Sequence, residues 1–161
     1  MYEEKKVQIF QKLSGARQTL LATLDELESE QWEKTVYSED AGWTVKDLFG
    51  HLMDSERSMT RLIEIIKEGG EGVPPDFDLK RWNARTIKKT TDLTTDEIRS
   101  KMISNRGRLL ELLYDMPDED WTKKGRHGSL QVMSIEEILN LIADHENDHL
   151  RDIVHVIEEG K

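Results

Sequence analysis

Residues 134–159 read SIEEILNLIADHENDHLRDIVHVIEE, and this stretch shows what kind of fold the chain adopts. Ser134 and Glu137 match a capping box, which is typical of the first turn of a helix. Apolar side chains then recur every three or four residues, as in a helix with one buried face. His145 and His149 lie on that face, one helical turn apart. The stretch therefore predicts a long helix that packs in a bundle and carries two imidazoles on its inner side.

Three further segments have the same helical period and complete a set of four long helices: residues 3–28, 44–68 and 94–116. Thr44 and Thr94 each begin a capping box, with an acidic residue three positions later. Gly69 and Pro117 follow the second and third segments as stop signals. The sequence shows no repeat, low-complexity tract or alternating strand pattern. We therefore predict a single all-α domain over residues 1–161.

The connection between the second and third helices indicates how the bundle is arranged. Residues 69–93 are long for a loop in a bundle, and they contain Pro74-Pro75 and a predicted short helix at about 79–90. Such a length is expected when the next helix starts from the same end as the previous one, because the chain must then cross over. The sequence therefore predicts an up-down-down-up four-helix bundle.

Composition and charge narrow the class of function. The 161 residues include 33 acidic and 23 basic side chains, and the formal net charge of −10 disfavours a nucleic-acid partner. No apolar run is long enough to cross a bilayer, and the opening MYEEKK is not typical of a signal peptide. We expect a cytoplasmic protein with a small-molecule substrate. Cysteine is absent, so any thiol chemistry needs a thiol from a small molecule.

Polar side chains interrupt the predicted buried stripes at a similar depth in the bundle. Besides the two histidines, the interruptions are Arg17, Ser55 and Asn105 in the first three helices. At 1.5 Å per residue they lie within about one to two turns of each other, which favours one internal polar site. For Arg17 we expect a packed stem and a charged head that reaches solvent, and a guanidinium inside a polar pocket is the alternative.

Phe10 and Leu13 are predicted to share the buried stripe of the first helix.

A third histidine, His51, borders the buried stripe of the second helix and can meet His145 and His149. Buried imidazoles are costly unless a partner satisfies them. Three neutral imidazoles at about 2.0–2.1 Å from an ion form a metal site with open positions, as catalytic sites do. The alternative is a set of core or half-exposed histidines without an ion. Nitrogen ligands favour zinc or nickel, with iron, copper or manganese as further candidates.

His145-Glu146-x-x-His149 also matches the H-E-x-x-H pattern of zinc proteases, in which the glutamate is the general base. The context argues against a protease, because only twelve residues follow His149 and His155 lies on the wrong face to be a downstream ligand. A ferritin-like di-iron site needs Glu-x-x-His on two helices, and Glu146-x-x-His149 is the only copy. The three-histidine site remains the favoured interpretation.

Two segments, GWTVKDLFGHL at 42–52 and HENDHLRDI at 145–153, resemble the signature segments of the DinB/YfiT-like superfamily. The segments 76–78, 82–85 and 115–121 are also typical, so the resemblance covers nearly the whole chain. It implies an up-down-down-up bundle whose three histidines, here His51, His145 and His149, bind a divalent metal. Members of that family include thiol-dependent enzymes, such as mycothiol-dependent maleylpyruvate isomerase and bacillithiol S-transferases, and homodimers are common among them.

Three functions are consistent with such a site. We favour a metal-dependent enzyme that activates a small-molecule thiol for transfer to an electrophile. In such an enzyme Arg17 or Asn105 could orient the substrate, although we expect both residues to have a structural role. The second function is hydrolysis by metal-bound water, with Glu56 or Glu146 as the base, although both are expected on exposed helix surfaces. The third is a non-catalytic metal-binding or stress-response protein. His127 is expected at the surface, in a loop that could cover the mouth of the site.

Overall fold

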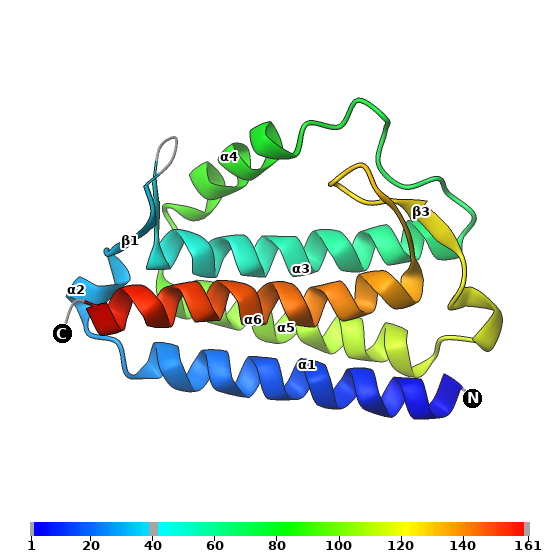
Figure 1. Ribbon diagram of the computed structural model, residues 1–161, viewed down its shortest axis with the longest axis horizontal. Helices are drawn as coiled ribbons and strands as arrows, with labels where there is room; N and C mark the ends of the chain where they lie inside the picture. The colour runs from blue at the N-terminus through cyan, green and yellow to red at the C-terminus, as the bar shows by residue number, and fades with distance from the viewer. Residues whose placement is uncertain (1, 39–41, 160–161) are drawn as a thin grey trace.

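Four long helices lie side by side in the computed structural model, which describes residues 2–38 and 42–159 (Figure 1). They are α1 (Tyr2–Asp25), α3 (Val45–Lys67), α5 (Thr95–Tyr114) and α6 (Ile135–Glu159). The predicted four-helix bundle is therefore confirmed. One boundary differs, because the first helix ends at Asp25 and the short α2 (Ser29–Trp32) follows it. None of the helices in the described ranges is both long and apolar enough to span a membrane.

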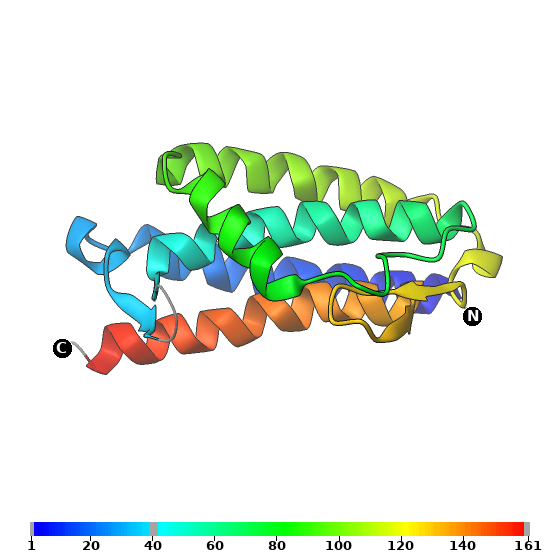
Figure 2. The ribbon, with the colours of Figure 1, turned by 90° about the horizontal axis from the view of Figure 1, so that it is seen from above.

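The helix directions confirm the predicted up-down-down-up order. α1 and α6 run toward one end of the bundle, whereas α3 and α5 run toward the other (Figure 1). Between α3 and α5 the chain returns through residues 68–94, which contain α4 (Leu79–Thr90). Figure 2 shows α4 running obliquely across the bundle, where it packs on α3. The predicted crossover and its short helix are both present.

Side chains at the helix starts form the predicted capping boxes. Thr44 Oγ1 accepts a hydrogen bond from the amide of Asp47, and the Asp47 carboxylate accepts one from the amide of Thr44. Each box satisfies amide donors that a helix start otherwise leaves free. The same reciprocal bonds are formed at α5 and α6 by Thr94 with Glu97 and by Ser134 with Glu137.

Two short antiparallel hairpins were not expected from the sequence. β1 (Thr35–Tyr37) pairs with β2 (Trp43–Thr44), and β3 (Lys124–Arg126) pairs with β4 (Val132–Ser134). Strands of two or three residues are too short to show an alternating pattern. Residues 39–41, in the loop of the first hairpin, lie outside the described part of the chain.

A close backbone contact attaches the crossover to the second hairpin. Gly72 forms a parallel bridge with Arg126, and the amide of Val73 donates to the carbonyl of Arg126 at 2.9 Å. Gly72 has a φ of +92°, and a Cβ atom there would lie 2.4 Å from the backbone of Arg126. Only glycine tolerates both this conformation and this approach. The crossover and the hairpin are therefore held together on one side of the bundle.

The apolar core consists of two clusters with a polar layer between them. One cluster includes Leu13, Ile63, Leu109 and Ile138. The other includes Leu20, Leu48, Met102 and Ile153. Each long helix contributes to both clusters and carries polar residues between them, so the predicted polar layer at one depth is present.

The buried faces differ from the prediction by one residue in two helices. In α1, Ile9 is buried, whereas Phe10 is 50% exposed. In α5, Arg106 is buried and Asn105 is half-buried. In each pair both residues lie three or four positions from the next core residue. A helical period of 3.6 residues therefore allows either residue of the pair to be the buried one. Packing against the neighbouring helices selects between them.

Candidate metal centre

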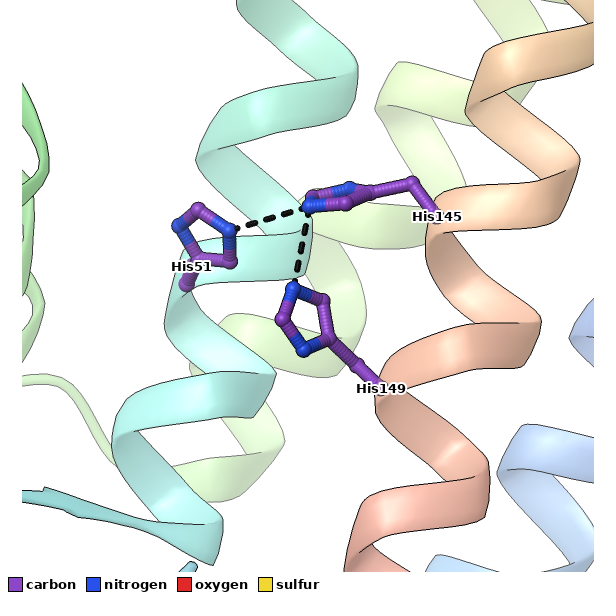
Figure 3. A group of neighbouring side chains, drawn as sticks. All are labelled: His51, His145 and His149. Atoms are coloured by element: carbon purple, nitrogen blue, oxygen red, sulfur yellow. Dashed lines mark hydrogen bonds between the residues drawn. The ribbon is translucent and has the colours of Figure 1, made fainter. Parts of the chain in front are cut away.

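Three histidines from two neighbouring helices meet in the polar layer. His51 projects from α3, and His145 and His149 project from α6 one turn apart, so that the rings face one another (Figure 3). The Nε2 atom of His145 lies 3.2 Å from Nε2 of His51 and 3.0 Å from Nε2 of His149. Among the described residues no fourth histidine, aspartate or glutamate belongs to this histidine group. The structure thus brings together the three residues that the sequence indicates.

The spacing and protonation of these nitrogens fit a metal ion. Two nitrogens at about 2.0–2.1 Å from one zinc ion lie roughly 2.8–3.4 Å apart at octahedral to tetrahedral angles. Both observed separations, 3.0 and 3.2 Å, fall in this range. Without an ion, Nε2 of His145 faces two other ring nitrogens, and a single proton there can satisfy only one of them. A cation between the three lone pairs satisfies all three.

The surroundings of the histidine group keep all three rings neutral at pH 7. Burial, with smaller contributions from the neighbouring His145 and His149, lowers the pKa of His51 to about 2. Burial, His149 and His127 likewise lower the pKa of His145 to about 4. Burial also lowers the pKa of His149, although Asp152 and Asp148 oppose the shift. Metals bind neutral imidazole, so the folded protein presents the three ligands in the form that binds.

A tyrosine of the first hairpin fixes the orientation of His149. The hydroxyl of Tyr37 donates a hydrogen bond to the Asp152 carboxylate, and its oxygen lies 3.0 Å from Nδ1 of His149. Because the one phenolic proton goes to Asp152, Nδ1 of His149 is the donor to Tyr37, which leaves its Nε2 lone pair directed at the other two rings. Burial and Asp152 raise the pKa of Tyr37, so this proton is retained.

The role of Tyr37 could not be predicted from the sequence, because this residue lies on a strand too short to recognise. The only available signal was Asp152, three residues after His149 and therefore on a neighbouring helix face.

The histidine group forms part of the wall of a pocket with a volume of about 420 Å³. Its other walls come from α3, α4, α6, the crossover and both hairpins. Ser55, predicted to lie at the level of the site, lines this pocket with Oγ 3.4 Å from Nδ1 of His51. On the other side of the His51 ring, Trp43 packs edge-on with ring centroids 4.9 Å apart.

His127 has a different place from the one expected. It is half-buried and lines the pocket, together with Gly128 in the loop of the second hairpin. Burial lowers its pKa, and its Nδ1 atom accepts a hydrogen bond from the amide of Ser129 at 3.1 Å. His127 is therefore less exposed than expected, and its loop contributes to the wall of the pocket.

A second polar group, the arginine–glutamate network, lies in the same layer and consists of Arg17, Glu56, Arg106 and Glu146. Arg17 Nη2 lies 2.6 Å from Glu56 Oε2 and 2.9 Å from Glu146 Oε1. Arg106 Nε lies 2.5 Å from Glu56 Oε1. Arg17 Nη1 donates to the backbone carbonyl of Met102, and Arg106 Nη1 donates to that of Leu13. All four side chains are buried, and none lines the pocket.

The network overturns three expectations, one each for Arg17, Glu56 and Glu146. Arg17 does not reach solvent, and Glu56 and Glu146 are not exposed, since burial is compensated by charge pairing. Burial alone would lower the pKa of Arg17, but Glu146 and Glu56 raise it above its ordinary value. Asn105 instead donates to the carbonyl of Met53 at 3.0 Å, away from the site.

The position of Glu146 bears on the H-E-x-x-H pattern. In a protease the glutamate would be a base beside the metal ligands. Here its Oε1 atom accepts from Arg17 at 2.9 and 3.1 Å, and Glu146 does not line the pocket. The pattern therefore combines two metal-ligand candidates with a structural glutamate.

The sequence and the fold of this chain are similar to those of known proteins. Residues 12–153 match the family model of the DinB superfamily. One similar solved structure is YfiT from Bacillus subtilis, which is described as a probable metal-dependent hydrolase with an unusual four-helix bundle topology. It is 20% identical to this chain, with a TM-score of 0.80. The match covers 99% of this chain and 89% of that one. No curated protein matches this sequence.

Two other solved structures have the same fold. A mycothiol-dependent maleylpyruvate isomerase is 15% identical with a TM-score of 0.73, over 95% of this chain and 60% of that one. TT2238, described as a four-helix bundle protein, is 17% identical with a TM-score of 0.69, over 93% of this chain and 98% of that one. At such identities the likeness concerns the fold.

Proposed function

This chain belongs to the DinB superfamily, and on that basis we propose that it is a divalent-metal-dependent enzyme whose ion is held by His51, His145 and His149. The observation that carries the proposal is the convergence of three Nε2 atoms in the wall of a pocket, with no fourth ligand among the described residues. Structural zinc sites are closed by four protein ligands, whereas catalytic sites keep a position open.

The ligand atoms and their surroundings indicate separate roles for the ion and for the protein side chains. Imidazole ligands favour zinc or nickel, with iron or manganese as further candidates. When bound, the ion would supply Lewis acidity and lower the pKa of a small-molecule nucleophile. The chain's own residues position the reactants: Tyr37 holds His149 in one orientation, and the largely apolar walls limit the water that reaches the site.

The finer proposal is that the nucleophile is a small-molecule thiol. The chain has no cysteine, so the sulfur must come from a second molecule. A protein of the same fold is a mycothiol-dependent maleylpyruvate isomerase, which supports a thiol in this kind of site. In a transfer reaction the thiolate sulfur would form a bond to an electrophilic carbon. The leaving group would depart with the bonding electrons, and the thiol proton would pass to solvent.

Hydrolysis is the second candidate, because YfiT, whose fold is similar, is described as a probable metal-dependent hydrolase. Water would then replace the thiol as the nucleophile. Neither Glu56 nor Glu146 is available as its base, because both carboxylates are paired with arginines outside the pocket. A proton would have to leave through solvent or through the substrate.

The proposal is tested by assaying the metal-loaded protein with two kinds of reagent. One assay combines a panel of cellular thiols with the chromogenic electrophile 1-chloro-2,4-dinitrobenzene, and the other contains 4-nitrophenyl acetate without thiol. The His149→Ala variant serves as the inactive reference. His155→Ala is its matched control, because His155 lies on the same helix, is exposed and pairs with Glu159 instead of with the histidine group.

We expect thiol-dependent product formation that is lost in His149→Ala and retained in His155→Ala. Ester hydrolysis without thiol would favour the second candidate. If neither assay exceeds the His149→Ala rate with any metal, the enzymatic proposal is wrong. Stoichiometric metal in such an inactive protein would indicate a non-catalytic metal-binding role.

A further inference from the structure

The described residues that line the pocket beside the histidine group carry no charged side chain. Seventeen residues of the ranges 2–38 and 42–159 line it, and none of them is Asp, Glu, Lys or Arg, although these four types make up 35% of the chain. Nearby charges are directed elsewhere: Glu146 accepts from Arg17, and Asp152 accepts from Tyr37. The neutral lining is therefore a specific property of this pocket.

The walls of the pocket are mainly aromatic and aliphatic. Phe77 of the crossover and Trp82 of α4 lie with their ring centroids 6.5 Å apart. Met59 and Leu62 of α3 and Leu141 of α6 also line the pocket. Its volume of about 420 Å³ is toward the lower end of the range, roughly 300–1,000 Å³, in which small molecules are bound. The pocket therefore has room for the apolar body of a small molecule.

One polar group in the lining has no hydrogen-bond partner. Asn83 of α4 lines the pocket, and its buried Oδ1 atom accepts no hydrogen bond from any described residue. A buried acceptor without a partner is unfavourable, and most such groups in folded proteins are satisfied by protein, water or ligand. After a rotation of the Asn83 side chain toward the pocket, an N–H or O–H group of a bound molecule would supply the missing donor.

We infer that the site accepts an uncharged molecule with an aromatic or aliphatic body and an N–H or O–H group that donates to Asn83. This inference deepens the proposed function, on which it rests, by naming the substrate class of the same site. An anionic body would lose its hydration without meeting a cationic side chain in this lining, which is costly. A negative charge could be compensated only at the ion itself.

Three probes of similar shape test the inference on metal-free protein: indole, benzothiophene and indole-2-carboxylate. Indole is neutral with an N–H donor, benzothiophene is neutral without one, and the carboxylate is an anion. Dissociation constants are measured by ligand-observed NMR after treatment with a chelator, so that no carboxylate can bind an ion. We expect indole to bind at least about tenfold more tightly than the anion, and about threefold to tenfold more tightly than benzothiophene.

Two variants locate these preferences in the pocket. Asn83→Leu should remove the preference for indole over benzothiophene while the neutral probes still bind. Trp82→Ala should weaken both neutral probes by about threefold to tenfold. The matched control is Tyr114→Ala, because Tyr114 is 81% exposed and does not line the pocket. Circular dichroism checks that each variant is folded.

The outcomes separate this inference from the proposed function. Equal or tighter binding of the anion, an unchanged preference in Asn83→Leu, or no binding of any probe at millimolar concentration overturns the inference. Zinc stoichiometry is measured on the same preparations. Stoichiometric zinc with no probe selectivity contradicts the inference alone, whereas probe selectivity with no zinc binding contradicts the metal-dependent proposal alone.

Discussion

The arginine–glutamate network and the histidine group lie in the same layer of the bundle, but their polar atoms are satisfied differently. In the network each long helix contributes one side chain, and two cations meet two anions. In the histidine group three neutral rings from two helices face one another and line a pocket. The network is balanced in charge by its own four side chains, whereas the histidines have no cationic partner in the part of the chain that the structure describes. A polar residue in a bundle core can thus hold helices together or bind a ligand, and its partners distinguish the two roles.

The largest effect is expected from removing one member of the network. Arg106→Met should lower the free energy of unfolding by about 3–5 kcal/mol, because it leaves buried carboxylates with too few cationic partners. Urea denaturation of metal-free protein measures the loss. The matched control is Arg108→Met on the same helix, where the side chain is 65% exposed and pairs with Glu64; its loss should be no more than about 1 kcal/mol.

A double variant sharpens this prediction. Replacing Arg106 with Met and Glu56 with Leu removes one cation and one anion together, so its loss should be smaller than the sum of the single losses. Additive losses, or an Arg106→Met loss equal to that of Arg108→Met, would contradict the idea that charge balance holds this region together.

Metal should stabilise the protein only through the histidine group. At a free zinc concentration of one hundred times the dissociation constant, the free energy of unfolding should rise by about 2.7 kcal/mol. His51→Ala should abolish this increment, because it removes the only ligand candidate that α3 contributes. Thermal unfolding with and without zinc measures it. An increment that persists in His51→Ala would place the ion elsewhere, and His155→Ala should leave it unchanged.

The histidine group should also make the metal-free protein sensitive to acid. The pKa of His51 is about 2 and that of His145 about 4 in the folded state, below the ordinary 6.5. As the pH falls below 6.5 the unfolded chain binds protons first, so stability falls. At pH 5 each of these histidines should lower the free energy of unfolding by about 2 kcal/mol relative to pH 7.

The difference between wild type and His51→Ala isolates this contribution from that of the carboxylates. Urea denaturation at pH 7 and pH 5 should show a smaller loss of stability in the variant. Identical losses in both proteins would mean that His51 is protonated in the folded state.

The smallest effect is expected from the hydroxyl that orients His149. Tyr37→Phe should weaken zinc binding by about tenfold, or about 1.4 kcal/mol, because Nδ1 of His149 loses its acceptor. A competition titration with a chromogenic chelator measures the affinity. Tyr114→Phe removes an exposed hydroxyl and should have no effect. Unchanged affinity in Tyr37→Phe would show that packing alone orients the ring.

The fold could be predicted because its determinants are local and repeated. Capping boxes at Thr44, Thr94 and Ser134 mark helix starts directly in the sequence, and the length of the crossover indicates the order of the helices. The hairpins could not be predicted, because their strands of two or three residues are too short to show an alternating pattern. The bridge between Gly72 and Arg126 was also not predictable, because these residues are far apart in the chain.

The candidate site was predictable only where its residues repeat at helical spacing. His145 and His149 stand one turn apart on an apolar stripe, and His51 borders the facing stripe. The arginine–glutamate network was not predictable. A charged residue on a helix is predicted to be exposed unless its partners on other helices are known. Helical period alone also cannot choose between Asn105 and Arg106.

The place of α6 in the chain has a consequence for when the protein can acquire metal. His51 and His145 are 94 positions apart, and α6 supplies two of the three histidines and one of the two network anions. Until α6 has docked on α3, Arg17 and Arg106 share a single glutamate and His51 lacks both of its histidine neighbours. If the ion is bound as proposed, its full set of three ligands therefore exists only after these two helices have packed together.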